Sequence, residues 1–183
     1  MLTPELIKKY WIFLLCLFSV RALPQETPPR IKEIRAAYNS IQKELETYRV
    51  KEINIEGASA EGGHIKGYYK KNRLIMMLDE YFGETGKVRN EYYFDKDKLI
   101  FVLEQKFLYN GPAGPANDSS RFTGNKTHII SERFYFENDE LILWLNENKN
   151  QVIKQPDLIR NKTKEVLETV GEMKKSLITK QGS

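Results

Sequence analysis

The chain of 183 residues contains a single cysteine, Cys16, which lies within an apolar run near the N-terminus. A thiol nucleophile and a disulfide framework are therefore excluded for everything that follows it. A domain of about 150 residues does not depend on disulfides, because it buries roughly two thirds of its surface on folding. The scarcity of cysteine limits the chemistry without arguing against a stable fold.

The chain is also poor in histidine and in catalytic motifs. It has 2 histidines, His64 and His128, and no metal-binding spacing such as H-E-x-x-H accompanies them. It contains no G-x-S-x-G elbow, no P-loop and no G-x-G-x-x-G turn. Acyl transfer, nucleotide hydrolysis and dinucleotide chemistry therefore lack their usual geometry. We expect neither a bound cofactor nor a metal ion.

A large excess of one charge is absent as well. The formal net charge is +4, and Lys8, Lys9 and Arg21 outweigh Glu5 before residue 23, so the remainder carries about +2. Non-specific nucleic-acid binding needs a broad basic field in which many cations neutralise phosphates together. We therefore expect no nucleic-acid partner.

The longest apolar run is too short to cross a bilayer. It extends from Tyr10 to Val20 and would span about 16 Å as a helix, roughly half of a hydrocarbon core. Lys8 and Lys9 precede the run and a polar break follows it, which is the layout of a secretory signal peptide. The small side chains at Val20 and Ala22 suit signal peptidase, so we predict cleavage after Ala22. An uncleaved anchor is the alternative.

These observations predict three parts: a signal peptide at 1–22, a proline-rich extended leader at 23–28 and a single domain at 29–180. Cys16 stands between Leu15 and Leu17, which argues against a lipidated cleavage site. We expect a periplasmic or secreted protein, and a bacterial one, since small secreted eukaryotic domains are usually held by disulfides. Sequons at Asn117, Asn125 and Asn161 arise readily by chance in a chain of this composition.

Two segments have the period of an amphipathic helix. Apolar residues recur at steps of three and four after Pro29, and again after Pro156. The positions are Ile31, Ile34, Tyr38, Ile41, Leu45 and Tyr48 in the first segment, and Ile159, Val166, Val170, Met173 and Leu177 in the second. This spacing predicts helices at about 29–48 and 157–178. Each must lay its apolar stripe on another surface, and a sheet is the available one.

Between them, short runs rich in Ile, Tyr, Phe and Leu alternate with turn clusters. The runs lie at 50–56, 64–70, 73–82, 87–94, 98–109, 127–136 and 141–146, with hairpin-length turns at 83–86, 95–98 and 137–140. This spacing predicts an antiparallel meander of about six or seven strands and an α+β fold. In the run at 98–109 we expect one core face, with Leu99, Phe101, Leu103, Phe107 and Tyr109, and one partly wet face, with Glu104 and Lys106.

One local pattern occurs three times: YYKKNRLI from Tyr68, YYFDKDKLI from Tyr92 and FYFENDELI from Phe134. Each copy is an aromatic pair, a polar turn and an aliphatic restart. Over residues 64–145 this pattern resembles the hairpin repeats of MORN-like bacterial proteins, although Gly67, Gly83 and Gly86 are the only residues that could match the glycines of those repeats. The resemblance implies meander geometry and brings no catalytic residues.

The aromatic content of the predicted strands suggests a binding role. Aromatic side chains at exposed sheet positions are typical of contact surfaces. The candidate binding residues are Tyr69, Tyr92, Tyr93, Tyr135 and Trp144. We therefore expect a non-catalytic module for a protein or an envelope glycan or lipid. The alternative is that the helices cover these rings, which are then core residues. The long segment at 110–125 is either functional or disordered.

Two other classes of function stay open. An enzyme could be centred on His64, His128 and Glu132, which requires the two imidazoles within about 7 Å of each other in a concave pocket. Asp79 and Glu80 could serve as general acid and base, although charged residues on the wet face of a sheet are far commoner. The third possibility is a structural or assembly subunit.

Overall fold

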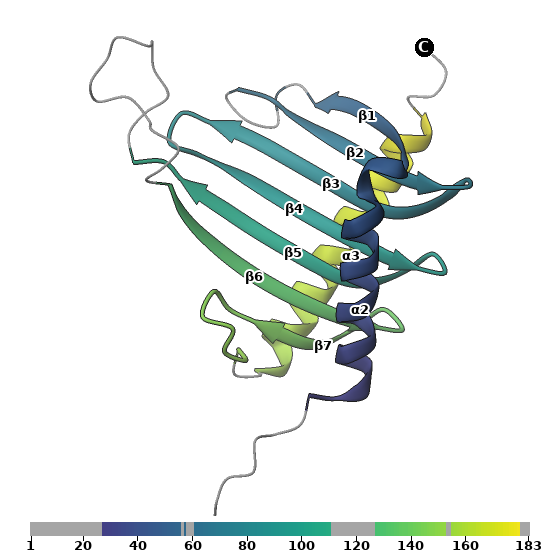
Figure 1. Cartoon of the computed structure of the whole chain (residues 1–183). Coiled ribbons are helices and arrows are strands. Elements are labelled where there is room, and N and C mark those ends of the chain that lie inside the picture. The colour runs from purple at the N-terminus through teal and green to yellow at the C-terminus, as the bar shows by residue number, and fades with distance from the viewer. Residues whose placement is uncertain (1–26, 56, 58–60, 111–126, 153–154, 180–183) are drawn as a thin grey trace, which may run out of the picture.

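The computed structural model describes residues 27–55, 57, 61–110, 127–152 and 155–179. The predicted α+β meander is confirmed: the sheet is antiparallel, and its seven strands lie side by side in chain order (Figure 1). The strands are β1 (Arg49–Ile55), β2 (Gly63–Lys70), β3 (Arg73–Gly83), β4 (Gly86–Asp95), β5 (Lys98–Leu108), β6 (His128–Glu137) and β7 (Glu140–Leu145). The helices are α2 (Pro29–Glu44), with a short 3-10 turn η2 (Leu45–Thr47) after it, and α3 (Pro156–Thr179).

The predicted signal peptide and its cleavage site lie outside the described residues, as do Asn117, Asn125 and most of the segment at 110–125. Among the described residues, none of the helices combines the length and the apolar character needed to cross a membrane.

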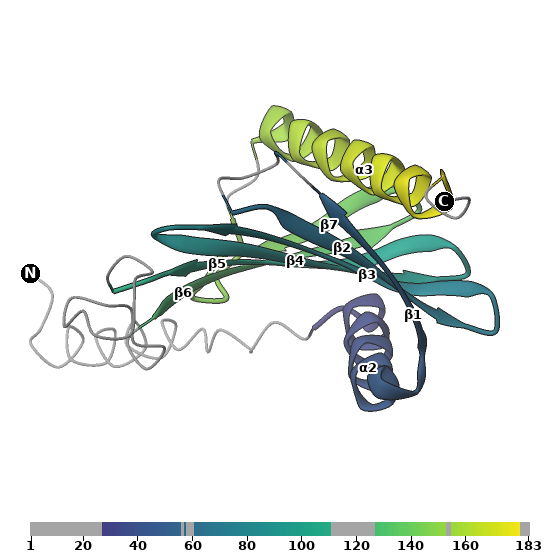
Figure 2. The ribbon, with the colours of Figure 1, turned by 90° about the horizontal axis from the view of Figure 1, so that it is seen from above.

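The two helices pack on opposite faces of the sheet (Figure 2). The sheet therefore has two core layers. The layer under α3 contains Ile53, Ile65, Met77, Tyr92, Phe94, Leu99, Val102, Phe134, Phe136, Val166, Val170, Met173 and Leu177. The layer under α2 contains Ile31, Ile34, Ile41, Tyr48, Met76, Leu78, Tyr93, Ile100, Phe101, Tyr135 and Leu145. The expectation of one core face and one partly wet face for the strand at 98–109 is wrong where α2 and α3 cover the sheet, because both faces are core there.

The helices leave one end of the sheet uncovered. Both helices lie across the sheet near the turns that join β2 to β3, β4 to β5 and β6 to β7. The opposite ends of β2–β6 extend beyond both helices (Figure 1). Charged and polar side chains gather in that half, since it includes His64, Lys87 and Arg89. The sheet thus has a covered half with two apolar core layers and an open half, where these polar side chains lie beside the exposed apolar residues Leu108 and Ile129.

The three sequence repeats are three hairpins with the same turn. The two central residues of each turn have left-handed backbone, with φ of 55° and 66° at Lys71 and Asn72, 47° and 66° at Lys96 and Asp97, and 51° and 66° at Asn138 and Asp139. Two successive residues in this conformation form a type I′ turn, whose twist matches that of the strands. Asn and Asp tolerate the conformation better than most residues, which is why they recur in these turns.

Each of these hairpins also contains a bulge at the same place. The register shifts by one residue after Tyr68, Tyr93 and Tyr135, so one residue on the returning strand has no partner. The extra residues are Ile75, Ile100 and Ile142, and all three belong to the core layer under α2. The final Ile of each repeat is therefore the bulged residue.

The bulge corrects one part of the sequence prediction. Leu99 lies in the core layer under α3, whereas Phe101 lies under α2. Strict alternation places Leu99 and Phe101 on one face of the sheet. The extra residue Ile100 lies between them and faces α2 together with Phe101, so Leu99 faces α3 instead.

Candidate functional site

The five aromatic residues predicted to bind a ligand do not share a face. Tyr92 and Trp144 pack under α3, whereas Tyr93 and Tyr135 pack under α2. The exposed fractions of Tyr92, Tyr93 and Tyr135 are 3%, 0% and 3%. Tyr69 lies on the α3 face, where its ring and Leu177 both approach Gly67. The expectation of one open aromatic face is wrong for these rings, because a helix covers each side of the sheet.

The strand order separates the two histidines. β2, which carries His64, and β6, which carries His128, have three strands between them, a distance of about 19 Å at the usual strand spacing. His64 faces the α2 side with its partner Glu80, whereas His128 and Glu132 share the α3 side with Phe134. The geometry contradicts an active site built from His64, His128 and Glu132.

The described residues also include no cluster of three or more His, Asp or Glu side chains placed to hold a metal ion.

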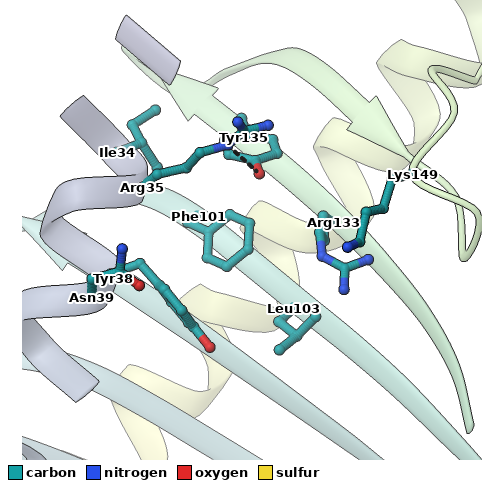
Figure 3. Close-up of a pocket in the computed structure, with 9 residues that line it drawn as sticks. All are labelled: Ile34, Arg35, Tyr38, Asn39, Phe101, Leu103, Arg133, Tyr135 and Lys149. Atoms are coloured by element: carbon teal, nitrogen blue, oxygen red, sulfur yellow. Dashed lines mark hydrogen bonds between the residues drawn. The ribbon is translucent and has the colours of Figure 1, made fainter. Parts of the chain in front are cut away.

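A cavity of about 310 Å³ lies between α2 and the sheet (Figure 3). Its lining comes from four separate parts of the chain: Ile34, Arg35, Tyr38 and Asn39 of α2, Phe101 and Leu103 of β5, Arg133 and Tyr135 of β6, and Lys149 after β7. Arg35, Asn39 and Lys149 are exposed, so the cavity opens to solvent on their side. Its volume is at the lower end of the range for small-molecule sites.

Aromatic rings form the floor and one wall of this cavity. Tyr38 makes edge contacts with Tyr93, at 5.0 Å between ring centres, and with Phe101, at 5.4 Å. Phe101 in turn packs against Tyr135 at 4.9 Å. These contacts fix the rings in place, because edge-to-face pairs at this distance are mutually attractive. The apolar surface of the cavity is preformed.

The charged groups of the lining are all cations. Arg35 donates from Nε to the Tyr135 hydroxyl at 3.4 Å. Arg133 has a buried Nη1 atom without a hydrogen-bond partner among the described residues. The ion pairs formed between described residues include none of Arg35, Arg133 and Lys149. The lining therefore carries three cationic groups and no acidic side chain.

The phenol of Tyr38 remains protonated in this environment. Burial raises the pKa of Tyr38 and the charge of Glu91 raises it further, while the cations Arg133 and Arg89 act in the opposite direction. The hydroxyl is thus a neutral donor and acceptor at physiological pH.

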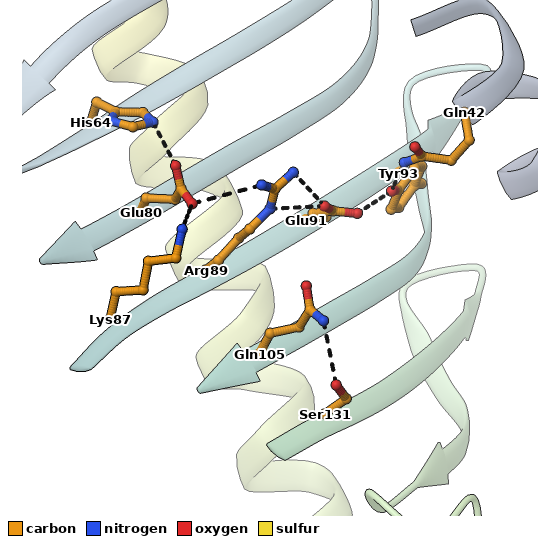
Figure 4. Close-up of polar contacts among 9 residues, drawn as sticks. All are labelled: Gln42, His64, Glu80, Lys87, Arg89, Glu91, Tyr93, Gln105 and Ser131. Carbon is orange, nitrogen blue, oxygen red and sulfur yellow. Dashed lines mark hydrogen bonds and ion pairs between the residues drawn. The ribbon is translucent and has the colours of Figure 1, made fainter. Parts of the chain in front are cut away.

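A chain of polar contacts crosses the α2 face in the open half of the sheet (Figure 4). One carboxylate oxygen of Glu80 accepts from Lys87 at 2.9 Å, and the other lies 3.2 Å from Nε2 of His64. Arg89 lies 3.7 Å from Glu80 and 2.8 Å from Glu91. Burial alone would raise the pKa of Glu80, but the hydrogen bond and charge of Lys87, with the charge of Arg89, lower it overall.

The same chain continues to α2. Glu91 accepts a hydrogen bond from the Tyr93 hydroxyl, which accepts from the Gln42 amide at 2.5 Å. Glu91 is only 5% exposed, so its charge needs these partners. We interpret the network as a structural one that connects the helix to the sheet.

A second buried carboxyl lies on the α3 face. Asp79 is 1% exposed, and its Oδ1 atom has no hydrogen-bond partner among the described residues. The Tyr92 hydroxyl lies 3.4 Å from Oδ2. Burial is the main cause that raises the pKa of Asp79 to about 6, while hydrogen bonds from Asn90 and Tyr92 limit the rise. The charge of Glu104 adds to the rise, and Glu104 is itself paired with Lys162 at 2.8 Å.

Known proteins offer no guide to this site: no family model, no curated protein and no solved structure matches the chain. Of the five residues predicted from the sequence to bind a ligand, only Tyr135 lines the cavity. Arg133 was detectable in principle, because it stands two residues before Tyr135 and so shares its face. A cation on the core face of a strand is unusual and points to a special environment.

Proposed function

We propose that this protein is an exported, non-catalytic binding module that holds a small ligand in the cavity beneath α2. The observation that carries the proposal is the preformed cavity of about 310 Å³, with aromatic walls and exclusively cationic charged groups. Concave sites with an apolar lining and a few convergent polar groups are the usual form of ligand-binding sites.

The composition of the lining supports binding rather than catalysis. It supplies two guanidinium groups, one ammonium group, two phenols and an amide, and no carboxylate, imidazole or thiol. Carboxylates, imidazoles and thiols are the commonest nucleophiles and general bases of enzymes, and none of them lines this cavity. Export rests on the order of residues 8–22, with two lysines, an apolar run and small residues before the cleavage point.

The cavity can be tested by closing it. Asn39 lies on its rim, so Asn39→Trp should obstruct the mouth without altering the core. The control is Ser40→Trp, since Ser40 is exposed on the same helix and does not line the cavity. NMR titration with indole, phenol, benzoate and cyclohexanol should show at least one probe that perturbs Tyr38 and Leu103.

We expect Asn39→Trp to abolish that perturbation and Ser40→Trp to preserve it. If all four probes leave the cavity resonances unchanged, or act equally on both variants, the proposed function is wrong.

A further inference from the structure

We propose that the ligand is a compact, ring-bearing acid whose carboxylate or phosphate group is bound by Arg133, with Lys149 as a second contact. This inference rests on the proposed function and names the class of ligand. It depends on the electrostatics of the cavity, on the geometry of Arg133 and on the size of the apolar space.

The first step concerns the unsatisfied donor. Nη1 of Arg133 is shielded from solvent and has no acceptor among the described residues. In the sheet, Arg133 stands between Leu103 and Leu145, so its neighbours across both strands are apolar. A buried donor without a partner is costly, so an acceptor supplied by a bound molecule would stabilise the Arg133 side chain.

The second step concerns the neighbouring charges. Figure 3 shows the Lys149 side chain reaching toward the Arg133 guanidinium, with Arg35 on the α2 side of the same cavity. Like charges repel unless an anion lies between them. Glu91, the carboxylate in the strand row next to Leu103, is already bound by Arg89 and Tyr93. No side chain of the lining supplies a counter-charge, so an anion from outside would offset this repulsion.

The third step concerns the rest of the ligand. Tyr38, Phe101 and Tyr135 offer ring surfaces beside Arg133, and Leu103 adds an aliphatic one. A planar or compact apolar body packs well on such surfaces. A volume of about 310 Å³ encloses one ring system with its substituents and is too small to enclose a whole peptide or lipid.

A guanidinium group binds carboxylate and phosphate in the same forked geometry. The test therefore compares benzoate and phenyl phosphate with benzamide, which has the same ring and no charge. Dissociation constants are measured by NMR titration of the purified protein. We expect at least one of the two anions to bind about tenfold or more tightly than benzamide, because charge-assisted hydrogen bonds are stronger than neutral ones.

Variants then assign the contact. Arg133→Gln should remove the preference for the anion, whereas Arg133→Lys should retain part of it because the charge remains. Arg160→Gln is the control, since Arg160 is an exposed cation of α3 on the opposite side of the sheet. It should leave all three affinities unchanged.

The two proposals fail in different ways. Benzamide that binds the cavity as tightly as both anions, or an anion preference that survives Arg133→Gln, would overturn the inference about the acid while ligand binding stands. If none of the three compounds enters the cavity, the inference about the acid is wrong, and the titration with indole, phenol and cyclohexanol decides whether ligand binding stands. Whichever of benzoate and phenyl phosphate binds more tightly identifies the acid group.

Discussion

Asp79 and Arg133 each have a buried polar atom that the surrounding protein does not satisfy. Oδ1 of Asp79 and Nη1 of Arg133 have no hydrogen-bond partner among the described residues. They differ in access: Arg133 lines a cavity that opens to solvent, whereas Asp79 is 1% exposed under α3. Arg133 is therefore a candidate ligand contact, whereas the carboxyl of Asp79 affects the stability of the fold.

Asp79→Asn should stabilise the protein at neutral pH. The carboxyl has a pKa of about 6 in the folded state, against an ordinary 3.8, so the folded state holds its proton more tightly than the unfolded state does. The protonated Asp79 carboxyl contributes fully to the free energy of unfolding below about pH 4. This contribution is lost as the pH rises through about 6, and it amounts to roughly 3 kcal/mol. The amide of an asparagine at this position would remain neutral throughout.

We expect a gain of about 2–3 kcal/mol in the free energy of unfolding at pH 7 and a much smaller one at pH 4, measured by urea denaturation. Glu147→Gln, at an exposed carboxylate after β7, serves as the control and should change little at either pH. A gain for Asp79→Asn that is the same at both pH values would show that the pKa of Asp79 does not differ between the folded and unfolded states.

Among the elements, the hairpins were the most predictable part of the fold. The polar pairs at 71–72, 96–97 and 138–139 are local signals, because a type I′ turn selects residues that tolerate positive φ. The strands on either side alternate clearly enough to give their bounds within a few residues. The face of Leu99 was not predictable from alternation, since Ile100 interrupts it.

Asn72→Gly should stabilise the hairpin between β2 and β3. Asn72 has a φ of 66°, which glycine adopts without steric cost, and the type I′ turn favours glycine at this second central position. We expect a small increase in the free energy of unfolding, below about 1 kcal/mol, because the relief at a positive φ outweighs the extra entropy that glycine gives the unfolded chain. Asn72→Val should reduce it by at least as much, because a β-branched residue resists this conformation. Thermal unfolding of the two variants beside the parent measures both effects, and a destabilising Asn72→Gly would contradict the turn geometry.

The helices show where sequence reasoning stops. Both amphipathic segments were predictable, and α2 and α3 lie close to the expected bounds. Their placement on opposite faces was not, because both faces of the covered half are apolar and the periodicity of a helix does not say which face it binds. The aromatic residues of β4 and β6 therefore divide between two core layers instead of forming one open surface.

For the whole molecule, the cavity follows from the way α2 crosses the sheet. Its lining joins residues of α2 with Phe101, Arg133 and Lys149, which are separated by tens of positions in the chain. Long-range proximity of this kind has no local sequence signal. The sequence predicted Ile34, Tyr38, Phe101 and Leu103 as packing residues and only Tyr135 as a binding residue. The cationic residues became candidates once the strand order and the helix were in place.

Export is a prediction about the entire chain. Expression of the full sequence in a bacterial host should yield a processed protein in the periplasm or medium, and N-terminal sequencing should find Leu23 as its first residue. Ala22→Trp should slow processing, because signal peptidase requires a small side chain before the cleavage point. An unprocessed protein that stays with the membrane fraction would instead favour the anchor interpretation.

The most direct test of ligand binding under α2 is a crystal structure of the processed protein grown with phenyl phosphate. We predict that the ring lies against Tyr38 and Phe101 and that phosphate oxygens accept hydrogen bonds from Arg133. A structure in which Arg133 turns to solvent and side chains fill the cavity, with no bound compound, would contradict the account.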